Sequence, residues 1–274
     1  MILNFGSIPH LTVVGCSALL CFFLWAALNR ASERTKTAFL FCLALINVLQ
    51  HFTKQLIYPH LRGAEFGLIN TASNVCAALI LLTPFALISK KGFFRIFVSY
   101  VGSIAAGGSL AFPLWFMGES ILQWEFLRFA VCHLLLLFTS FLPVLWGMRR
   151  PSYRDFWKTA PLFLFVLTVL LVNNAAVVFL NPKIAPEMRY TELYQINPFG
   201  IMHPTGTFPV FDRLCTALSP KCFLPQENNA FYTPVLWYAI PVTLLVTLVS
   251  LLLFCLIDRK RLQRDFKKFL EKFG

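Results

Sequence analysis

The sequence predicts an all-α, multi-pass membrane protein built as a bundle of about seven transmembrane helices. Of its 274 residues, 58% are hydrophobic and only 13% are charged, whereas a soluble domain carries about 25% charged residues. The chain also contains apolar stretches of about 18 residues or more with few charges, which is the usual signature of a spanning helix. The expected spans are Leu11–Leu28, Ala38–Ile57, Phe66–Ile88, Phe94–Met117, Trp124–Gly147, Trp157–Leu180 and Tyr232–Ile257.

The first apolar stretch is interpreted as a spanning helix rather than a signal peptide. A signal peptide begins with a positively charged region and ends in a small-residue cleavage site. No Lys or Arg precedes Leu11, and the segment LWAALNRAS is a poor cleavage site. We therefore expect this stretch to remain in the membrane.

Glycine and proline in the later spans fit membrane helices. The fourth span contains Gly102, Gly107 and Gly108, and small residues allow membrane helices to pack closely. Membrane helices also tolerate proline. The prolines inside or near the ends of the spans are Pro84, Pro143, Pro161 and Pro241.

The basic residues indicate an orientation. Most of the 24 Lys and Arg residues lie in the first, third and fifth loops and in the tail after Ile257. Because positive residues are retained on the cytoplasmic side, we expect the N-terminus outside and the C-terminus in the cytoplasm. The predicted organisation is a transmembrane domain at 1–257 followed by a basic cytoplasmic tail at 258–274.

A long outward loop, Asn181–Phe231, separates the last two spans. It is too long for a simple connector, so we expect it to pack partly over the outer mouth of the bundle. It contains Cys215 and Cys222. Outside the cytoplasm such a pair can form a disulfide, and two free thiols are an equally good interpretation.

The tail Asp258–Phe273 predicts an amphipathic helix on the anionic inner face of the membrane. Its apolar residues recur at helical spacing with basic residues between them, a pattern typical of interfacial helices. Anchoring is the favoured role, and sensing is the alternative. The apolar positions are Leu262, Phe266, Phe269, Leu270 and Phe273.

Polar residues gather in the outer half of the predicted bundle. Cys76 and His133 each lie about 14–15 Å below the outer boundary if their helices begin at Phe66 and Trp124. The second span adds a stripe with i, i+3 and i+4 spacing. The remaining polar residues considered are Asn47, Gln50, His51 and Lys54 in the second span, Asn70, Ser73 and Asn74 in the third, and Asn173 and Asn174 in the sixth.

This layer predicts a reactive pair, Cys76 and His133. A thiolate is a nucleophile, and a neighbouring imidazole can take the proton of the thiol. Nearby amides can hold a developing oxyanion. The competing interpretation is structural, because Cys often acts as a small hydrophobic residue and Asn or His can simply join helices. The candidate substrate-binding residues are Asn47, His51, Asn74, Asn173 and Asn174.

Three segments resemble a known family. They are NVCAALILLTPFALISKKGF, FAVCHLLLLFTSFLPVL and LVNNAAVVFLNPK, within residues 66–185. Together they resemble the YwaF-like integral membrane proteins, which include the mammalian transmembrane acyltransferase that remodels ether phospholipids. The resemblance implies that Cys76 and His133 match the proposed catalytic Cys and His. The family often has Asn after this Cys, where the present chain has Ala77.

Two functions from different classes follow. The first is an intramembrane phospholipid acyltransferase in which Cys76 is the nucleophile. The second is a non-catalytic transporter or sensor in which the polar layer lines a binding cavity. The near absence of polar residues in the inner halves of the spans disfavours a path through the membrane. A purely structural bundle would leave the polar residues paired with one another.

Other classes are disfavoured by composition and motif. The net charge of +12 lies in short loops and the tail, so we expect no nucleic-acid partner. The sequence has no phosphate-binding Gly-rich loop, zinc spacing or dinucleotide fingerprint, so no metal or cofactor is expected. The expected partners are membrane lipids, through phospholipid acyl chains. The expected location is the cell membrane, which would be the cytoplasmic membrane in a bacterium.

Overall fold

The computed structural model describes residues 1–53, 71–72, 74–113, 116–196 and 236–273, together with isolated positions between 212 and 224. The chain divides into two compact units, which are described separately. Unit 1 comprises Met1–Arg149 and Leu180–Ile184, and unit 2 comprises Arg150–Phe179 and Ala185–Gly274. The transmembrane domain expected at 1–257 therefore contains two packing units.

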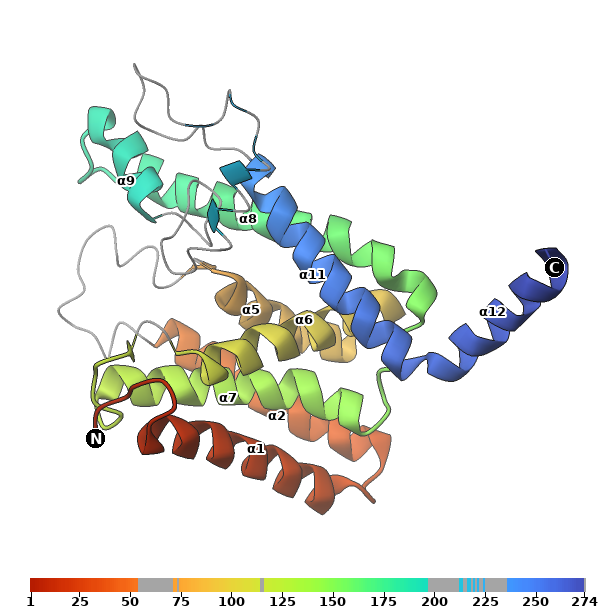
Figure 1. Cartoon of the computed structure of the whole chain (residues 1–274). Helices are drawn as coiled ribbons and strands as arrows, with labels where there is room; N and C mark the ends of the chain where they lie inside the picture. The colour runs from red at the N-terminus through yellow and green to blue at the C-terminus, as the bar shows by residue number, and fades with distance from the viewer. Residues whose placement is uncertain are drawn as a thin grey trace. The chain divides into compact units, whose positions relative to one another are not determined.

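The described residues are helical throughout their regular structure. Unit 1 contains the helices α1 (Ile8–Leu28), α2 (Glu33–Phe52), α5 (Val75–Ile88), α6 (Gly92–Ala111) and α7 (Trp124–Leu145). Unit 2 contains the 3₁₀ helices η2 (Tyr153–Lys158) and η3 (Pro186–Met188) and the α-helices α8 (Thr159–Phe179), α9 (Arg189–Ile196), α11 (Leu236–Ile257) and α12 (Arg259–Phe273). Figure 1 shows these elements along the chain.

The described residues contain fewer full-length spans than the seven predicted. Five helical segments are long and apolar enough to cross a membrane, and a sixth is obtained if α11 and α12, bent by 89°, count as one span. The third predicted span, Phe66–Ile88, appears only as α5, which has 14 residues. Residues 66–70 lie outside the described part. The chain is thus a multi-pass membrane protein with five or six such segments in its described part.

Capping residues explain where two helices of unit 1, α2 and α5, begin. A side-chain oxygen at the N-cap satisfies one of the backbone N–H groups that the first turn leaves unpaired. Ser32 accepts the N–H of Thr35 at 3.1 Å, so α2 begins earlier than the predicted Ala38. Asn74 accepts the N–H of Ala77 at 2.9 Å, so α5 begins at Val75.

Unit 1 packs around α7, which contacts α1, α2, α5 and α6. In Figure 1, α7 lies alongside α1 and α6. One core cluster joins four of these helices through Cys21, Leu40, Ala44, Leu87, Phe138 and Leu142. The opposite faces carry exposed apolar side chains, such as Phe22 and Phe23 on α1. These faces contact lipid, because hydrocarbon is the only solvent that accepts them at membrane depth.

An N-terminal strap, residues Met1–Asn4, crosses the start of α7. Leu3 donates to the carbonyl of Glu119 at 2.7 Å, and Gly118 donates to the carbonyl of Leu3 at 2.8 Å. Ile2 and Ser120 form an isolated antiparallel bridge. The strap therefore joins the start of the chain to the segment that leads into α7.

In unit 2, a partly buried hydroxyl and an ion pair hold α12 against η2. The Tyr153 hydroxyl donates to Asp265 Oδ2 at 2.8 Å, and Arg154 donates to the same oxygen at 2.6 Å. The 15-residue α12 leaves Phe266, Phe269 and Leu270 exposed. The predicted tail helix is therefore present, while its place on the membrane surface stays a prediction.

Most of the predicted outward loop Asn181–Phe231 lies outside the described residues, including Cys215 and Cys222. Its described part includes η3 and the 8-residue helix α9. The expectations of a cover over the outer mouth and of a disulfide stay predictions.

The close contact between α6 and α7 predicts a stability defect in Gly102→Ala. A methyl group at Gly102 would overlap Ser140 Oγ and lie 3.0 Å from Ser140 Cβ. Overpacking of this kind costs about 1–3 kcal/mol, so we expect a lower midpoint of thermal unfolding in detergent. Gly108→Ala is the control, because no atom lies within 4 Å of its added methyl group. Equal midpoints for the two variants would contradict this packing.

The contact between η2 and α12 predicts that Asp265→Asn releases the tail helix. A neutral amide loses the ion pair with Arg154, and an isolated helix of this length is marginal in water. We expect amide hydrogen exchange within α12 to speed up several-fold in detergent. Glu271→Gln is the matched control, because its pair with Lys267 is long, at 3.9 Å, and exposed. Unchanged exchange in Asp265→Asn would show that the contact does not hold the helix.

Candidate functional site

The candidate site in unit 1 is built on a polar contact between α2 and α7. Asn47 Nδ2 donates to the carbonyl of Cys132 at 3.0 Å, and Gln50 Nε2 donates to the carbonyl of Arg128 at 3.2 Å. From Asn47 to Gln50 the donors advance by three residues along α2. The acceptors go back by four residues along α7, from Cys132 to Arg128. The two helices therefore run antiparallel here, and the stripe predicted on α2 faces α7.

This contact leaves two acceptor atoms buried. Asn47 is 2% exposed, and neither Asn47 Oδ1 nor Gln50 Oε1 has a hydrogen-bond partner among the described residues. Buried amide oxygens normally accept a hydrogen bond from protein or water. The α2 side of the site can thus accept hydrogen bonds from a polar group. His51 is 1% exposed, and the predicted Lys54 lies outside the described residues.

Cys76 lies in the first turn of α5, one residue after Val75. The prediction of a helix beginning at Phe66 had placed it about ten residues deep. Its Sγ is 3.8 Å from Ser109 Oγ near the end of α6, and it interacts electrostatically with Cys132 of α7. The partial positive charge at the start of a helix favours a negative sulfur, while burial opposes it.

His133 is oriented by its own helix. Its Nδ1 is 2.8 Å from the carbonyl oxygen of Phe129, one turn earlier. A carbonyl oxygen only accepts, so this hydrogen bond requires a proton on Nδ1. In the neutral ring, Nε2 then has the lone pair and can act as a base. The Phe129 ring, 4.2 Å away between centroids, packs against the imidazole.

The structure therefore brings Cys76 to Ser109. A direct pairing of Cys76 with His133 stays a prediction. Ser109 was not singled out in the sequence. The signal that could have found it is its position near the end of the fourth span, which runs antiparallel to the third.

Asn74 has a structural role that was not predicted from the sequence. Its side-chain oxygen caps α5 and accepts the N–H of Ala77, so it is the residue that positions Cys76 at the start of a helix. A role in binding substrate stays a prediction.

Asn173 and Asn174 lie on α8 in unit 2. Asn173 Nδ2 is 3.4 Å from Asn174 Oδ1, and Asn174 is fully buried. Because they belong to the other unit, their predicted place in the same polar layer as Cys76 stays a prediction.

Comparison with known families gives one decisive match. The model of the TMEM164 family matches residues 5–254, which include most of both units and every candidate site residue. The chain belongs to the TMEM164 family. No curated protein and no solved structure gave a match in the corresponding comparisons.

Membership of the TMEM164 family agrees with a multi-pass membrane protein. The matched residues begin just after the N-terminal strap, run nearly to the end of α11 and exclude α12. The finer resemblance to YwaF-like proteins, and the acyl transfer that it implies, stay predictions.

The contact between α2 and α7 predicts that Asn47→Ala weakens unit 1. The variant removes one hydrogen bond inside the membrane, which is worth about 0.6 kcal/mol on average and about 1.7 kcal/mol at most. We expect a lower unfolding midpoint in a denaturing-detergent titration. Leu49→Ala, on a residue that is 64% exposed, is the control on the same helix. A midpoint for Asn47→Ala no lower than that of the control would show that this hydrogen bond does not stabilise unit 1.

Proposed function

We propose that this TMEM164 family member is an intramembrane phospholipid acyltransferase that uses Cys76 and His133. The observation that carries the proposal is the hydrogen bond from His133 Nδ1 to the carbonyl of Phe129. This bond assigns the proton of the neutral ring to Nδ1, which leaves Nε2 as the base. A fixed tautomer is what a general base needs, and catalytic histidines are oriented in the same way by a third group.

In the first half-reaction, Cys76 Sγ attacks the ester carbonyl of a donor phospholipid. Nε2 of His133 takes the thiol proton as the S–C bond forms. The ester C–O bond then breaks, and the leaving lysophospholipid hydroxyl receives that proton. The acyl chain remains on Cys76 as a thioester.

In the second half-reaction, the hydroxyl of an acceptor lysophospholipid attacks the thioester carbonyl. His133 takes the hydroxyl proton, the new C–O bond forms, and the S–C bond breaks. The proton returns to Sγ, so the protein is regenerated with no net redox change. Ser109, at 3.8 Å from Sγ, supports the scheme because its hydroxyl can donate to the thiolate.

A second candidate function is supported by a different observation. The buried oxygens Asn47 Oδ1 and Gln50 Oε1 have no hydrogen-bond donor among the described residues. A polar ligand held on these oxygens, without chemistry at Cys76, would make the protein a transporter or a sensor.

Acyl exchange in vesicles separates the two functions. Purified protein is mixed with an isotope-labelled phospholipid and a lysophospholipid, and transfer is followed by mass spectrometry. General-base catalysis is worth about 10²–10⁴-fold, so His133→Ala should lower the rate by at least about 100-fold. Cys76→Ser should do the same. Intact mass spectrometry of the unmodified chain should show an acyl adduct on Cys76 that hydroxylamine removes.

Cys42→Ser is the matched control, because Cys42 is an exposed thiol on α2. Its rate should equal that of the natural sequence. An equal loss in Cys42→Ser would indicate a packing effect. Full exchange in both Cys76→Ser and His133→Ala would refute the acyltransferase and leave the binding function.

A further inference from the structure

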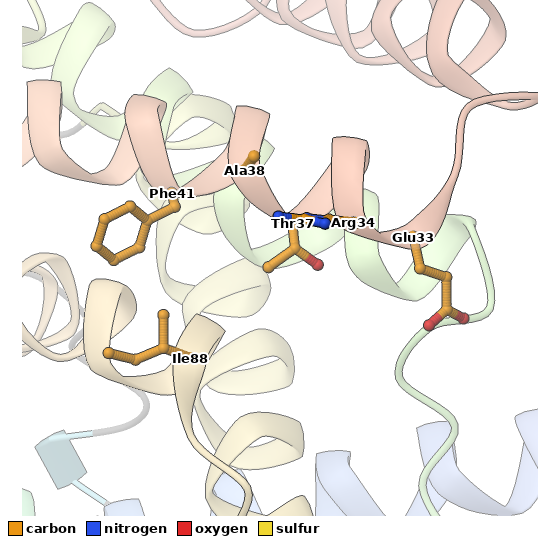
Figure 2. Close-up of a pocket in the computed structure, with 6 residues that line it drawn as sticks. All are labelled: Glu33, Arg34, Thr37, Ala38, Phe41 and Ile88. Carbon is orange, nitrogen blue, oxygen red and sulfur yellow. The ribbon is translucent and has the colours of Figure 1, made fainter.

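A groove opens between α2 and α5 at the basic end of unit 1, defined as the end where α1, α5 and α7 finish and α2 and α6 begin. Its volume is about 440 Å³, which is within the range of small-molecule sites. Figure 2 shows the lining side chains on the start of α2 and the last residue of α5. The lining residues are Glu33, Arg34, Thr37, Ala38, Phe41 and Ile88.

The groove is apolar toward one end and polar toward the other. Phe41 and Ile88 lie toward one end of the groove, and Glu33 lies at the other end, with Arg34 and Thr37 between them (Figure 2). Ile88 is 63% exposed. Because a side chain of this kind on a membrane helix faces lipid, the apolar part of the groove is open to acyl chains.

Arg149 is influenced by the charge of Glu33, a residue of the groove, and is only 6% exposed. Its Nη1 donates to the carbonyl of Met148 at 3.0 Å. Its Nη2 is buried and has no partner among the described residues, and the same holds for Nε of Arg95. Buried guanidinium donors without acceptors are costly, so a further anion at this end of unit 1 would be stabilised.

The charges around Arg149 also indicate that positive charge is in excess here. Burial, followed by the nearby charge of Arg95, lowers the pKa of Arg149 to about 10, and Glu33 opposes this shift. The guanidinium therefore remains charged at neutral pH. Glu33 lines the groove, so Arg149 and the groove share one electrostatic environment. Among these four residues, one carboxylate, Glu33, therefore stands against three guanidinium groups, those of Arg34, Arg95 and Arg149.

We propose that this groove binds one anionic phospholipid, with the phosphate at Arg34, which lines the groove, and an acyl chain along Phe41 and Ile88. Guanidinium groups bind phosphate through charge-assisted hydrogen bonds. Basic pockets between spanning helices are also known to bind anionic head groups.

This site is separate from the proposed catalytic centre. Cys76 lies in the first turn of α5 and Ile88 is the last residue of the same helix. At 1.5 Å per residue, the two ends are about 18 Å apart. The ester bonds of a phospholipid lie beside its phosphate, so a lipid in the groove keeps them far from Cys76. The groove therefore holds a bound lipid that is distinct from the acyl donor.

Native mass spectrometry of the purified full chain tests the proposal. The probes are phosphatidylglycerol and phosphatidylcholine with identical acyl chains, with glycerol 3-phosphate as a soluble phosphate. We expect one saturable phosphatidylglycerol, bound at least about tenfold more tightly than phosphatidylcholine. Arg34→Gln should weaken this binding about tenfold. Arg34 is exposed, so this variant should fold even where Arg149→Gln does not.

Lys90→Gln is the matched control. Lys90 is an exposed basic residue at the same end of the unit that does not line the groove, and its loss should change the affinity by less than about twofold. Equal affinities for the two lipids, or equal losses in the two Gln variants, would overturn the proposal. Glycerol 3-phosphate binding as tightly as phosphatidylglycerol would replace the lipid with a free phosphate. None of these measurements depends on acyl exchange, so the two proposals can fail independently.

Discussion

The scarcity of hydrogen-bond partners in hydrocarbon governs the arrangement of unit 1. A polar side chain at membrane depth must find its partner within the protein. The backbone carbonyls of α7 provide three such partners, for Asn47, Gln50 and His133. The same requirement therefore selects the face that α2 presents to α7, aligns the two helices along their length and fixes the orientation of the imidazole.

The helical, membrane-spanning character could be predicted because it depends on apolar length alone. The stripe on α2 could also be predicted, since residues 47, 50 and 51 share one side of any helix. The start of α5 could not, because hydropathy continues through the region before it, whereas the helix begins where Asn74 supplies a cap. Cys76 consequently lies in the first turn of α5 rather than about ten residues into a helix, and its depth in the membrane stays a prediction.

The candidate site was recognised only in part for a related reason. The sequence identified residues that titrate or react, such as Cys76 and His133. It could not indicate that the Ser109 hydroxyl would lie within hydrogen-bond distance of Cys76 Sγ, since a serine in a Gly-rich helix is ordinarily a packing residue. Nor could it identify the tautomer of His133, which depends on the local carbonyl of Phe129. Both features require the side chains to be placed in three dimensions.

Two buried cations at the basic end of unit 1 have different surroundings. At the basic end, Lys36 is 8% exposed, donates to the carbonyl of Asn29 and lies over the ring of Trp146. The carbonyl oxygen and the aromatic face therefore both stabilise the positive charge of Lys36. Arg149 has one carbonyl and a second guanidinium nearby, which is a much poorer environment. This contrast between neighbouring cations marks the groove as unusual.

The N-terminal strap has a consequence for biogenesis. Its partners lie more than one hundred positions later in the chain, as does the contact of His10 with Ala111, which spans 101 positions. Contacts so distant in sequence form slowly, because a long loop must close first. Newly made α1 and α2 therefore wait in the bilayer, shielded only by lipid, until the segment before α7 has been synthesised. The strap can form only after residues 118–121 have been made, immediately before α7.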